Sequence, residues 1–457
     1  MMPVAALAGL VPAVGFPLLG PIAEQHHVSP AAATWVLTST FLASAVSTPL
    51  VGRFSDLYGH RRVLVAALAI ALAGSVLIAT TPNFAVLILG RACQGIAAPL
   101  YPLAIAVLQR ELGGRELRGS ISTVTLVMAA GGAVGLVAAG IAGTSADYRI
   151  VFWLPVALCV VAVVGVGMGT RSAEPRAGGK VDVLGAVLLS ASLVLVLLPL
   201  SRAARWGIES PQVLGLLCAG AVVGAAFVAV ERRAVDAILP GRLLRNSAVV
   251  VSTLTFMCVV SAVFVPMAAV PILVQATPSI METGRTTPLV TALVYLLPAA
   301  LLGAVGTPLA TWLVGRAGVR AALTTAGVLS VTGSAAMVLA PDLPPALIAG
   351  LLLTTVALFM SYGAVPLLLV GHVDRGDLGA VNAVGSLGRW VASAVVTAAA
   401  SLMLTQSPIG EPLSRADFRW TFALGLAVSV GVLVTVAFLP REERPPRSVS
   451  TRAAREW

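Results

Sequence analysis

Charged residues are scarce in this chain. Only 11% of its 457 residues are Asp, Glu, Lys or Arg, whereas 58% are hydrophobic, and the mean hydropathy is +0.97. A water-soluble domain could not hide so much apolar surface, so a soluble globular fold is excluded. Stretches such as 63–81 and 211–230 lack charge altogether. At about 1.5 Å per residue, each can cross a hydrocarbon core of roughly 30 Å, so the sequence predicts an all-α membrane protein embedded in a lipid bilayer.

Cysteine and histidine are also rare, with four of each. All four cysteines lie in apolar segments, where they are typical of small hydrophobic residues rather than of disulfide partners or metal ligands. The apolar segments contain no paired acids, no HExxH sequence and no Gly-x-Ser-x-Gly turn. We therefore expect no enzyme activity, no metal and no cofactor. An intramembrane enzyme or a scaffold is the alternative from a different class.

The net charge of +10 would suggest a nucleic-acid partner in a soluble protein. Most of the 29 basic residues lie instead in alternate loops between apolar segments. This distribution follows the positive-inside rule, which places both termini in the cytoplasm of a multi-pass protein of the cell membrane. We therefore expect no nucleic-acid partner.

Apolar runs bounded by charges, Pro and Gly predict fourteen transmembrane helices. Residues 1–182 hold six helices and a linker, and residues 248–440 hold another six, so we expect two six-helix bundles. The other two helices fall in residues 183–247, which we expect to form an inserted helical hairpin and a second linker. Residues 441–457 are charged and contain proline, which is typical of a cytoplasmic tail.

The loop expected after the second helix carries the most specific motif, GRFSDLYGHRR over residues 52–62. Gly52 would let helices approach closely, Asp56 could accept from the N-terminus of a neighbouring helix, and Gly59 would supply the turn. An ordinary basic turn is the alternative. The residues singled out in this loop are Gly52, Asp56, Gly59, Arg61 and Arg62.

This spacing resembles the signature loop of the major facilitator superfamily. A weaker echo, TWLVGRAGVR over residues 311–320, stands at the matching place in the second group of helices, with Gly315 in place of the acid. The internal duplication of the superfamily would produce such an echo. The resemblance implies two bundles around a central cavity, with the loop at 52–62 closing the cytoplasmic side.

Two expected helices carry polar side chains on one face. At about 100° per residue, Arg91, Gln94 and Tyr101 share one side of the helix near 84–109. On the helix near 379–405, the spacing groups Asn382, Ser386 and Arg389 in the same way.

An arginine at the bilayer centre costs at least about 2.5 kcal/mol, which makes it a functional hypothesis by default. The alternatives are an Arg91 that reaches the membrane surface, and hydroxyls that only join helices. The residues assigned to the transport path or to coupling are Arg91, Gln94, Gly95, Tyr101, Asn382 and Arg389.

Further motifs extend the resemblance over nearly the whole chain. Residues 89–95 are similar to the second motif of the superfamily. Gly131, Gly135 and Gly140 are similar to its antiporter motif, although glycines at this spacing are also typical of a helix-packing surface. Residues 181–185 and 239–246 are similar to the fourteen-helix drug:proton antiporter branch. The resemblance implies a monomer that exports a small amphipathic compound by alternating access, in exchange for protons. An importer or facilitator of a small metabolite is the alternative.

The nineteen Asp and Glu residues all fall in expected loops or helix ends. Cation exporters of this branch usually keep an acid in the first helix, where this chain has Pro12. Two intramembrane arginines without a matching acid favour an anionic or neutral amphipathic substrate. Proton coupling would then use Asp56, Glu24 or the pair His26 and His27.

Overall fold

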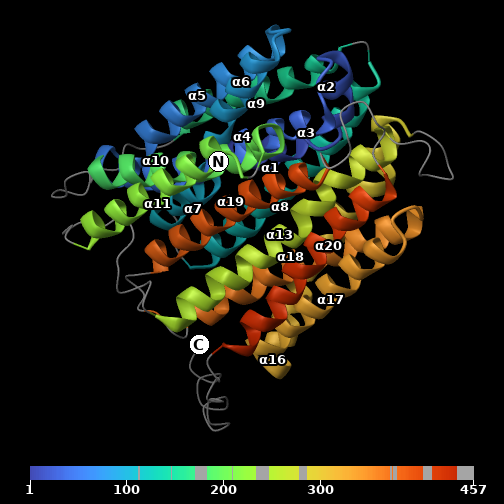
Figure 1. The fold of residues 1–457 in the computed structure, drawn as a ribbon. Helices are drawn as coiled ribbons and strands as arrows, with labels where there is room; N and C mark the ends of the chain where they lie inside the picture. Colours follow the sequence, from blue (N-terminus) through green and yellow to red (C-terminus); the bar gives the residue numbers. More distant parts are fainter. Residues whose placement is uncertain are drawn as a thin grey trace.

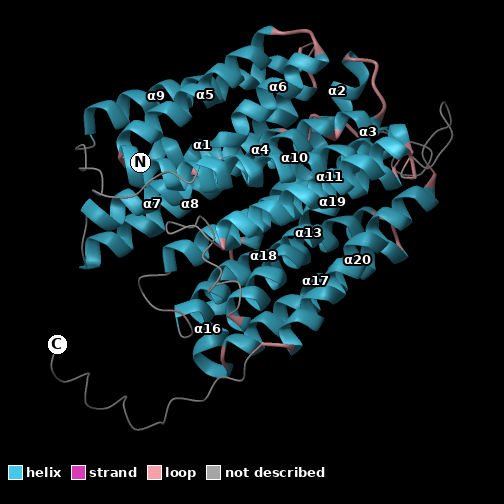
Figure 2. Cartoon of the chain, turned by 60° about the vertical axis from the view of Figure 1, so that its left-hand side comes forward, coloured by secondary structure: helices cyan, strands magenta, loops and turns pink. Residues whose placement is uncertain are grey.

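The computed structural model describes residues 1–111, 114–145, 147–169, 183–207, 209–232, 246–276, 286–370, 373, 378–404 and 414–439. All regular structure in these ranges is helical, as Figure 2 shows. The helices run nearly side by side, and their connections gather at two ends of the molecule (Figure 1). We call these the Gly59 end, where α4 meets α5, and the Gln25 end, where α2 ends.

The first group of helices runs from the N-terminus to α9. Its elements are α1 (Met2–Val14), α2 (Leu19–Gln25), α3 (Pro30–Ala33), α4 (Trp35–Tyr58), α5 (His60–Thr80), α6 (Phe84–Gln94), the 3-10 turn η1 (Gly95–Ala97), α7 (Leu100–Glu111), α8 (Gly114–Gly143), the 3-10 turn η2 (Tyr148–Phe152) and α9 (Trp153–Gly169). Two helices follow, α10 (Val183–Trp206) and α11 (Pro211–Glu231).

The second group begins at α13. Its elements are α13 (Ser247–Ala276), α14 (Pro288–Val290), the π-helical segment η3 (Thr291–Leu296), α15 (Leu297–Gly303), α16 (Gly306–Ala317), α17 (Val319–Leu339), α18 (Pro344–Val370), α19 (Leu378–Met403) and α20 (Arg415–Ala437).

Twelve helical segments among the described residues are long and apolar enough to cross a membrane, and α1 with α2 would form a thirteenth. The described apolar stretch of α10 covers only Val187–Val196. The architecture is therefore that of an all-helical, multi-pass membrane protein with about twelve spans.

Two of the expected helices are interrupted by proline. The span expected near 4–23 is bent by 59° between α1 and α2, where Pro17 provides no backbone N–H. The span expected near 287–313 is π-helical over Thr291–Leu296, and Pro298, just beyond it, cannot donate the next α-helical hydrogen bond. The single helix predicted near 4–23 is therefore broken at this bend, whereas the helix predicted near 287–313 is confirmed as one candidate span, Pro288–Ala317, with a local π-helical segment.

The two groups repeat the same frame. At the Gly59 end, Gly59 and Gly318 turn the chain with φ of 86° and 87°. Two residues after each turn, an arginine caps another helix of its own group: Arg61 Nη2 donates to the carbonyl of Gly167, and Arg320 Nη2 donates to that of Ala437 at 3.1 Å. These caps place a cation at a helix C-terminus, where the dipole favours it. The repeat agrees with the duplication expected from the sequence.

Apolar packing joins the two groups most extensively at the Gln25 end. One large cluster there takes fully buried side chains from both groups, among them Ile22, Phe41, Leu273 and Phe418. Two other clusters lie wholly within the first and second groups respectively. The pair α10 and α11 packs beside α4 and α19, through a cluster that includes Leu189.

Candidate functional site

The motif at residues 52–62 is mostly helix rather than loop. α4 continues to Tyr58 and α5 starts at His60, so only Gly59 forms the turn, as predicted. Among the described residues, no atom beyond its own helix backbone lies within 4 Å of where a Cβ on Gly52 would sit. Gly52 therefore makes no close contact with the described residues in this conformation, and its role at a close helix approach stays a prediction. The side chain of Asp56 lies outside the described part of the chain, and that of Arg62 is exposed.

Arg91 is enclosed by three helices of the first group. Its side chain has 0% exposure. Nη1 donates to the carbonyl of Val11 at 3.0 Å and to Gln94 Oε1 at 2.8 Å, and Nε donates to the carbonyl of Val36 at 3.2 Å. Arg91 therefore joins α6 to α1 and α4 in this conformation, and its role in a transport path stays a prediction.

Hydroxyl groups extend this cluster. Gln94 Nε2 donates to Ser75 Oγ on α5 at 2.8 Å, and Ser44 Oγ on α4 donates to the carbonyl of Gly95 at 3.0 Å. A Cβ on Gly95 would lie 2.7 Å from that of Ala43, so a side chain there would push α4 away. Sequence reasoning found Arg91, Gln94 and Gly95 but missed the serines, because Ser residues on apolar helices are common and carry little signal.

Arg389 lies on α19 among aromatic rings of the second group. Its guanidinium carbon is 5.4–5.5 Å from the ring centroids of Phe256, Tyr362 and Trp390. Nη1 donates to Tyr362 Oη at 3.0 Å and Nη2 donates to Ser386 Oγ at 3.2 Å. Nε has no hydrogen-bond partner among the described residues. The polar face predicted for this helix therefore brings Ser386 and Arg389 together.

Two of the predicted path residues remain, Tyr101 and Asn382. Tyr101, on α7, is half-buried. Asn382 belongs to α19, but its side chain is outside the described part of the chain.

Aromatic rings meet where the two groups face each other. Phe41 of α4 stacks on Trp390 of α19, with centroids 6.0 Å apart, and meets Phe264 of α13 edge-on at 4.9 Å. Phe264 also contacts Phe16, in the α1–α2 bend, at 5.8 Å. Only 5% of the residues are aromatic, so their gathering here is a feature that single-helix periodicity could not reveal.

The glycines of α8 allow two close helix contacts. A Cβ on Gly131 would collide with the backbone of α1, and one on Gly135 would lie 3.0 Å from the carbonyl oxygen of Leu10. Further toward the Gln25 end, a Cβ on Gly140 would lie 2.7 Å from that of Ala292 in η3. The first contact is within one group and the second is between the two groups.

The Gln25 end is closed by a second inter-group contact. Gln275 Nε2, near the end of α13, donates to the carbonyl of Pro17 at 3.2 Å. A Cβ on Gly20 would lie 3.4 Å from the Cβ of Gln275. A cavity of about 280 Å³ lies beside this contact, lined in part by Glu24 and Thr286.

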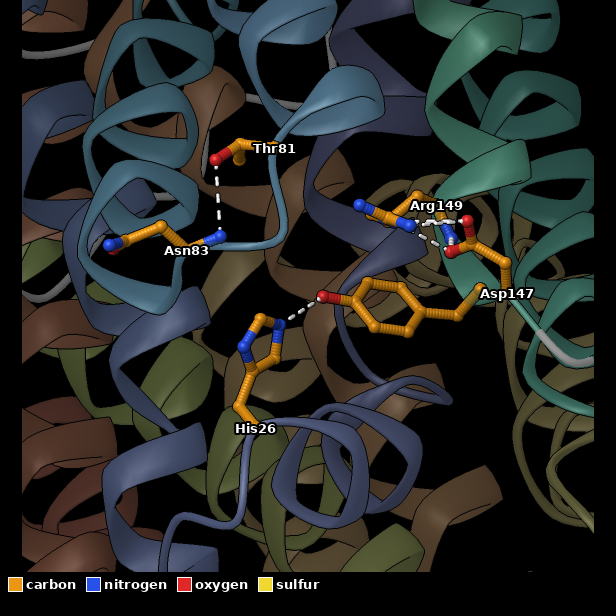
Figure 3. A network of polar contacts seen from close by, with 6 residues as sticks. His26, Thr81, Asn83, Asp147 and Arg149 are labelled. Carbon is orange, nitrogen blue, oxygen red and sulfur yellow. Dashed lines mark hydrogen bonds and ion pairs between the residues drawn. The ribbon is translucent and has the colours of Figure 1, made fainter.

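A polar network covers the first group at the same end (Figure 3). His26 and Tyr148 Oη share a hydrogen bond of 2.7 Å, while Arg149 pairs with Asp147 at 2.8 Å. Burial, followed by repulsion from Arg149 and His27, holds the pKa of His26 below its usual value. The hydrogen bond from Arg149 lowers the pKa of Asp147. Protonation of His26 would thus add a positive charge near that of Arg149.

The sequence profile of the Major Facilitator Superfamily matches residues 1–397. The chain belongs to the major facilitator superfamily. Among curated proteins, this member is 29% identical over 225 residues to a lincomycin resistance protein of Streptomyces lincolnensis, covering 48% of the chain and 46% of that protein. It is 34% identical over 223 residues to the cephamycin export protein CmcT of Amycolatopsis lactamdurans, covering 47% and 45%. The match thus spans about half the length of these relatives.

Solved structures share the fold of this superfamily member. The nucleoside transporter NupG superposes with a TM-score of 0.66 at 9% identity, covering 96% of this chain and 99% of that one. The xylose transporter XylE from E. coli gives 0.61 at 16% identity, with the same coverage. At such identities the likeness establishes the fold alone.

Proposed function

We propose that this protein is a secondary transporter that exports a small amphipathic compound by alternating access. The curated relatives named above are resistance and export proteins, and the family and fold agree with this activity. The observation that carries the proposal is the arrangement of contacts at the Gln25 end. There, two bundles with the same frame are closed against each other through Gln275 and Pro17, and through Gly140 and Ala292.

Orientation and topology form part of the proposal. The basic residues concentrated toward the Gly59 end favour a cytoplasmic position for that end and for both termini. The Gln25 end would then face the exterior. We propose fourteen spans in a monomer, with residues 1–182 and 248–440 forming the two bundles, residues 183–247 the inserted hairpin and its linker, and residues 441–457 the tail. The packing of α10 against α4 and α19, and of α11 against α10, supports the insertion.

A reversible cross-link at the Gln25 end tests alternating access. The distance between the expected Cβ of Gly20 and that of Gln275 is 3.4 Å, close to the roughly 3.5–4.5 Å of a disulfide. In a variant lacking the four native cysteines, Gly20→Cys with Gln275→Cys should lose efflux on oxidation and regain it on reduction. Each single cysteine variant is the matched control. Efflux that continues in the fully cross-linked protein would overturn alternating access.

Coupling to protons is a separate part of the proposal. Asp56, Glu24 and the pair His26 and His27 remain its candidates. Purified protein in liposomes should move substrate faster when a pH gradient is imposed. In liposomes in which the orientation of the protein is known, the direction of net substrate movement distinguishes an exporter from an importer. Flux that is indifferent to the gradient would exclude proton exchange.

A further inference from the structure

The guanidinium of Arg389 has no carboxylate beside it among the described residues. Its hydrogen-bond partners are two neutral hydroxyls, Tyr362 Oη and Ser386 Oγ, and its Nε has none. A half-buried cation inside a membrane normally has an acid or carbonyl groups as partners. Elsewhere in this chain, Arg149 has Asp147 and Arg91 has carbonyls. Arg389 therefore has capacity left for an acceptor that the described chain does not supply.

The surroundings of Arg389 also limit what that acceptor can be. Phe256, Tyr362 and Trp390 come from α13, α18 and α19, and their rings surround the guanidinium at 5.4–5.5 Å. Phe256 is 7% exposed, whereas Tyr362 is 37% exposed, so the approach to Arg389 lies on the tyrosine side. An aromatic ring of a ligand can pack on these rings, which favour offset or edge contacts with other rings.

The positive charge of Arg389 selects among the ligands that could pack against these aromatic rings. A cation would be repelled by Arg389, and a neutral compound would leave its remaining donor capacity unused. A carboxylate or sulfonate matches the planar donor fork of a guanidinium and forms charge-assisted hydrogen bonds. The Tyr362 hydroxyl, which now accepts from Nη1, can rotate to donate to the same anion.

We propose that Arg389 and the aromatic rings around it bind the acidic group of an aromatic anion, and that such anions are the substrates of this protein. The inference rests on the proposed transport function. Trp390 also connects this site to the other bundle, because its ring stacks on Phe41 of α4. A ligand that displaces Trp390 as it binds to Arg389 would therefore loosen the contact between the bundles.

Equilibrium binding of radiolabelled 1-naphthoate to the purified full-length protein tests the proposal. The competitors are 1-naphthamide, which has nearly the same shape without the charge, and the cation 1-naphthylmethylammonium. We expect the naphthoate anion to bind about tenfold more tightly than either competitor, since tenfold corresponds to one good charge-assisted contact. Arg389→Gln should abolish that preference, and Tyr362→Phe should reduce it.

Arg316→Gln is the matched control. Arg316 also lies over an aromatic ring, with its guanidinium carbon 4.5 Å from the Trp312 centroid, but on α16 near the Gly59 end. The Arg316→Gln variant should keep the preference for naphthoate. If Arg389→Gln does not elute as a folded protein, two other measurements test the proposal. They are the preference of the wild-type protein for the anion and the preference of Arg389→Lys, which keeps the charge. Wild-type protein without a preference for the anion, or Arg389→Gln with an unchanged preference, would overturn the proposal.

Binding and transport can fail separately. Protein that binds naphthoate through Arg389 but moves no compound across liposomes would overturn the proposed function and leave the site intact. Protein that exports the cation ethidium without binding naphthoate would overturn the site and leave the function intact.

Discussion

The two bundles share a frame but differ in how each holds its intramembrane arginine. In the first bundle, Arg91 is fully enclosed and donates to Val11, Val36 and Gln94. In the second, Arg389 is half-buried, and its hydrogen-bond partners are two hydroxyls. The same chemical group is thus a structural link in one bundle and available to a ligand in the other.

The difference follows from the helices that face each arginine. Arg91 lies opposite the carbonyls of Val11 on α1 and Val36 on α4. A Cβ on Gly15 would lie 3.0 Å from Nη2, so the lack of a side chain there leaves room for the guanidinium. Arg389 lies opposite the rings of Phe256 and Tyr362, which offer π faces but no carboxylate. The two groups therefore share their turns and helix caps but differ in the partners that they offer to the arginine.

The largest expected effect is on the stability of Arg91 variants. Arg91→Lys should lower the unfolding free energy by about 2–4 kcal/mol, because an ammonium keeps the buried charge but cannot reach both carbonyls and Gln94 at once. Arg91→Met, which removes the charge as well, should cost less. The Tm values of the purified variants would show which substitution is the more destabilising. An Arg91→Lys protein as stable as wild type would contradict the structural role that distinguishes Arg91 from Arg389.

Arg389→Gln should affect transport strongly and stability little, the opposite of what we expect for the Arg91 variants. We expect efflux of an anionic probe to fall at least about tenfold, the loss of one charge-assisted contact, while the Tm changes little because no buried acid loses its partner. Efflux from cells and thermal unfolding of the same protein should be measured together. A Tm loss as large as that of Arg91→Lys would mean that both arginines are structural.

Gly140→Leu probes the contact between the bundles rather than either bundle alone. A leucine there would collide with Ala292, whose Cβ would lie 2.7 Å from the added Cβ. We expect the Gln25 end to open, so that a cysteine at Gln275 reacts several-fold faster with a water-soluble maleimide. Gly52→Leu is the control: among the described residues, no atom beyond its own helix backbone lies within 4 Å of the added Cβ, so that rate should stay unchanged.

The smallest effect tests the shared frame. Arg61→Ala and Arg320→Ala each remove a cap from a helix C-terminus, which is worth roughly 0.3–1 kcal/mol at an exposed position. The two variants should lose similar stability in parallel Tm measurements. A loss of stability in only one of the two variants would indicate that the two caps do not contribute equally to stability.

Composition and motif spacing predicted the membrane location, the superfamily and the turn at Gly59, because these depend on local patterns and on the total apolar surface. The two arginines were also found by their helical spacing. Their different environments were not, since periodicity shows which face of a helix is polar but not what lies opposite it. Only the structure distinguishes Arg91 from Arg389 in this respect.

Predictions that depended on contacts between distant segments were less successful. Gly52 was expected at a close helix approach, which stays a prediction, whereas close approaches among the described residues lie at Gly131, Gly135 and Gly140. The spacing of these glycines alone did not say that Gly140 serves a different contact from the other two. The hydrogen bond from Gln275 to Pro17 joins α13 to the bend between α1 and α2, and the local sequence around neither residue indicates this contact.

The position of α10 has a consequence for the surrounding lipid. This helix packs against α4 of one bundle and α19 of the other, so any rocking motion must slide or tilt it. A membrane of unsuitable thickness, which favours one tilt of a helix over another, would then resist one half of the cycle more than the other. Changing the acyl-chain length of the host bilayer should alter the turnover rate even though no substrate contact changes.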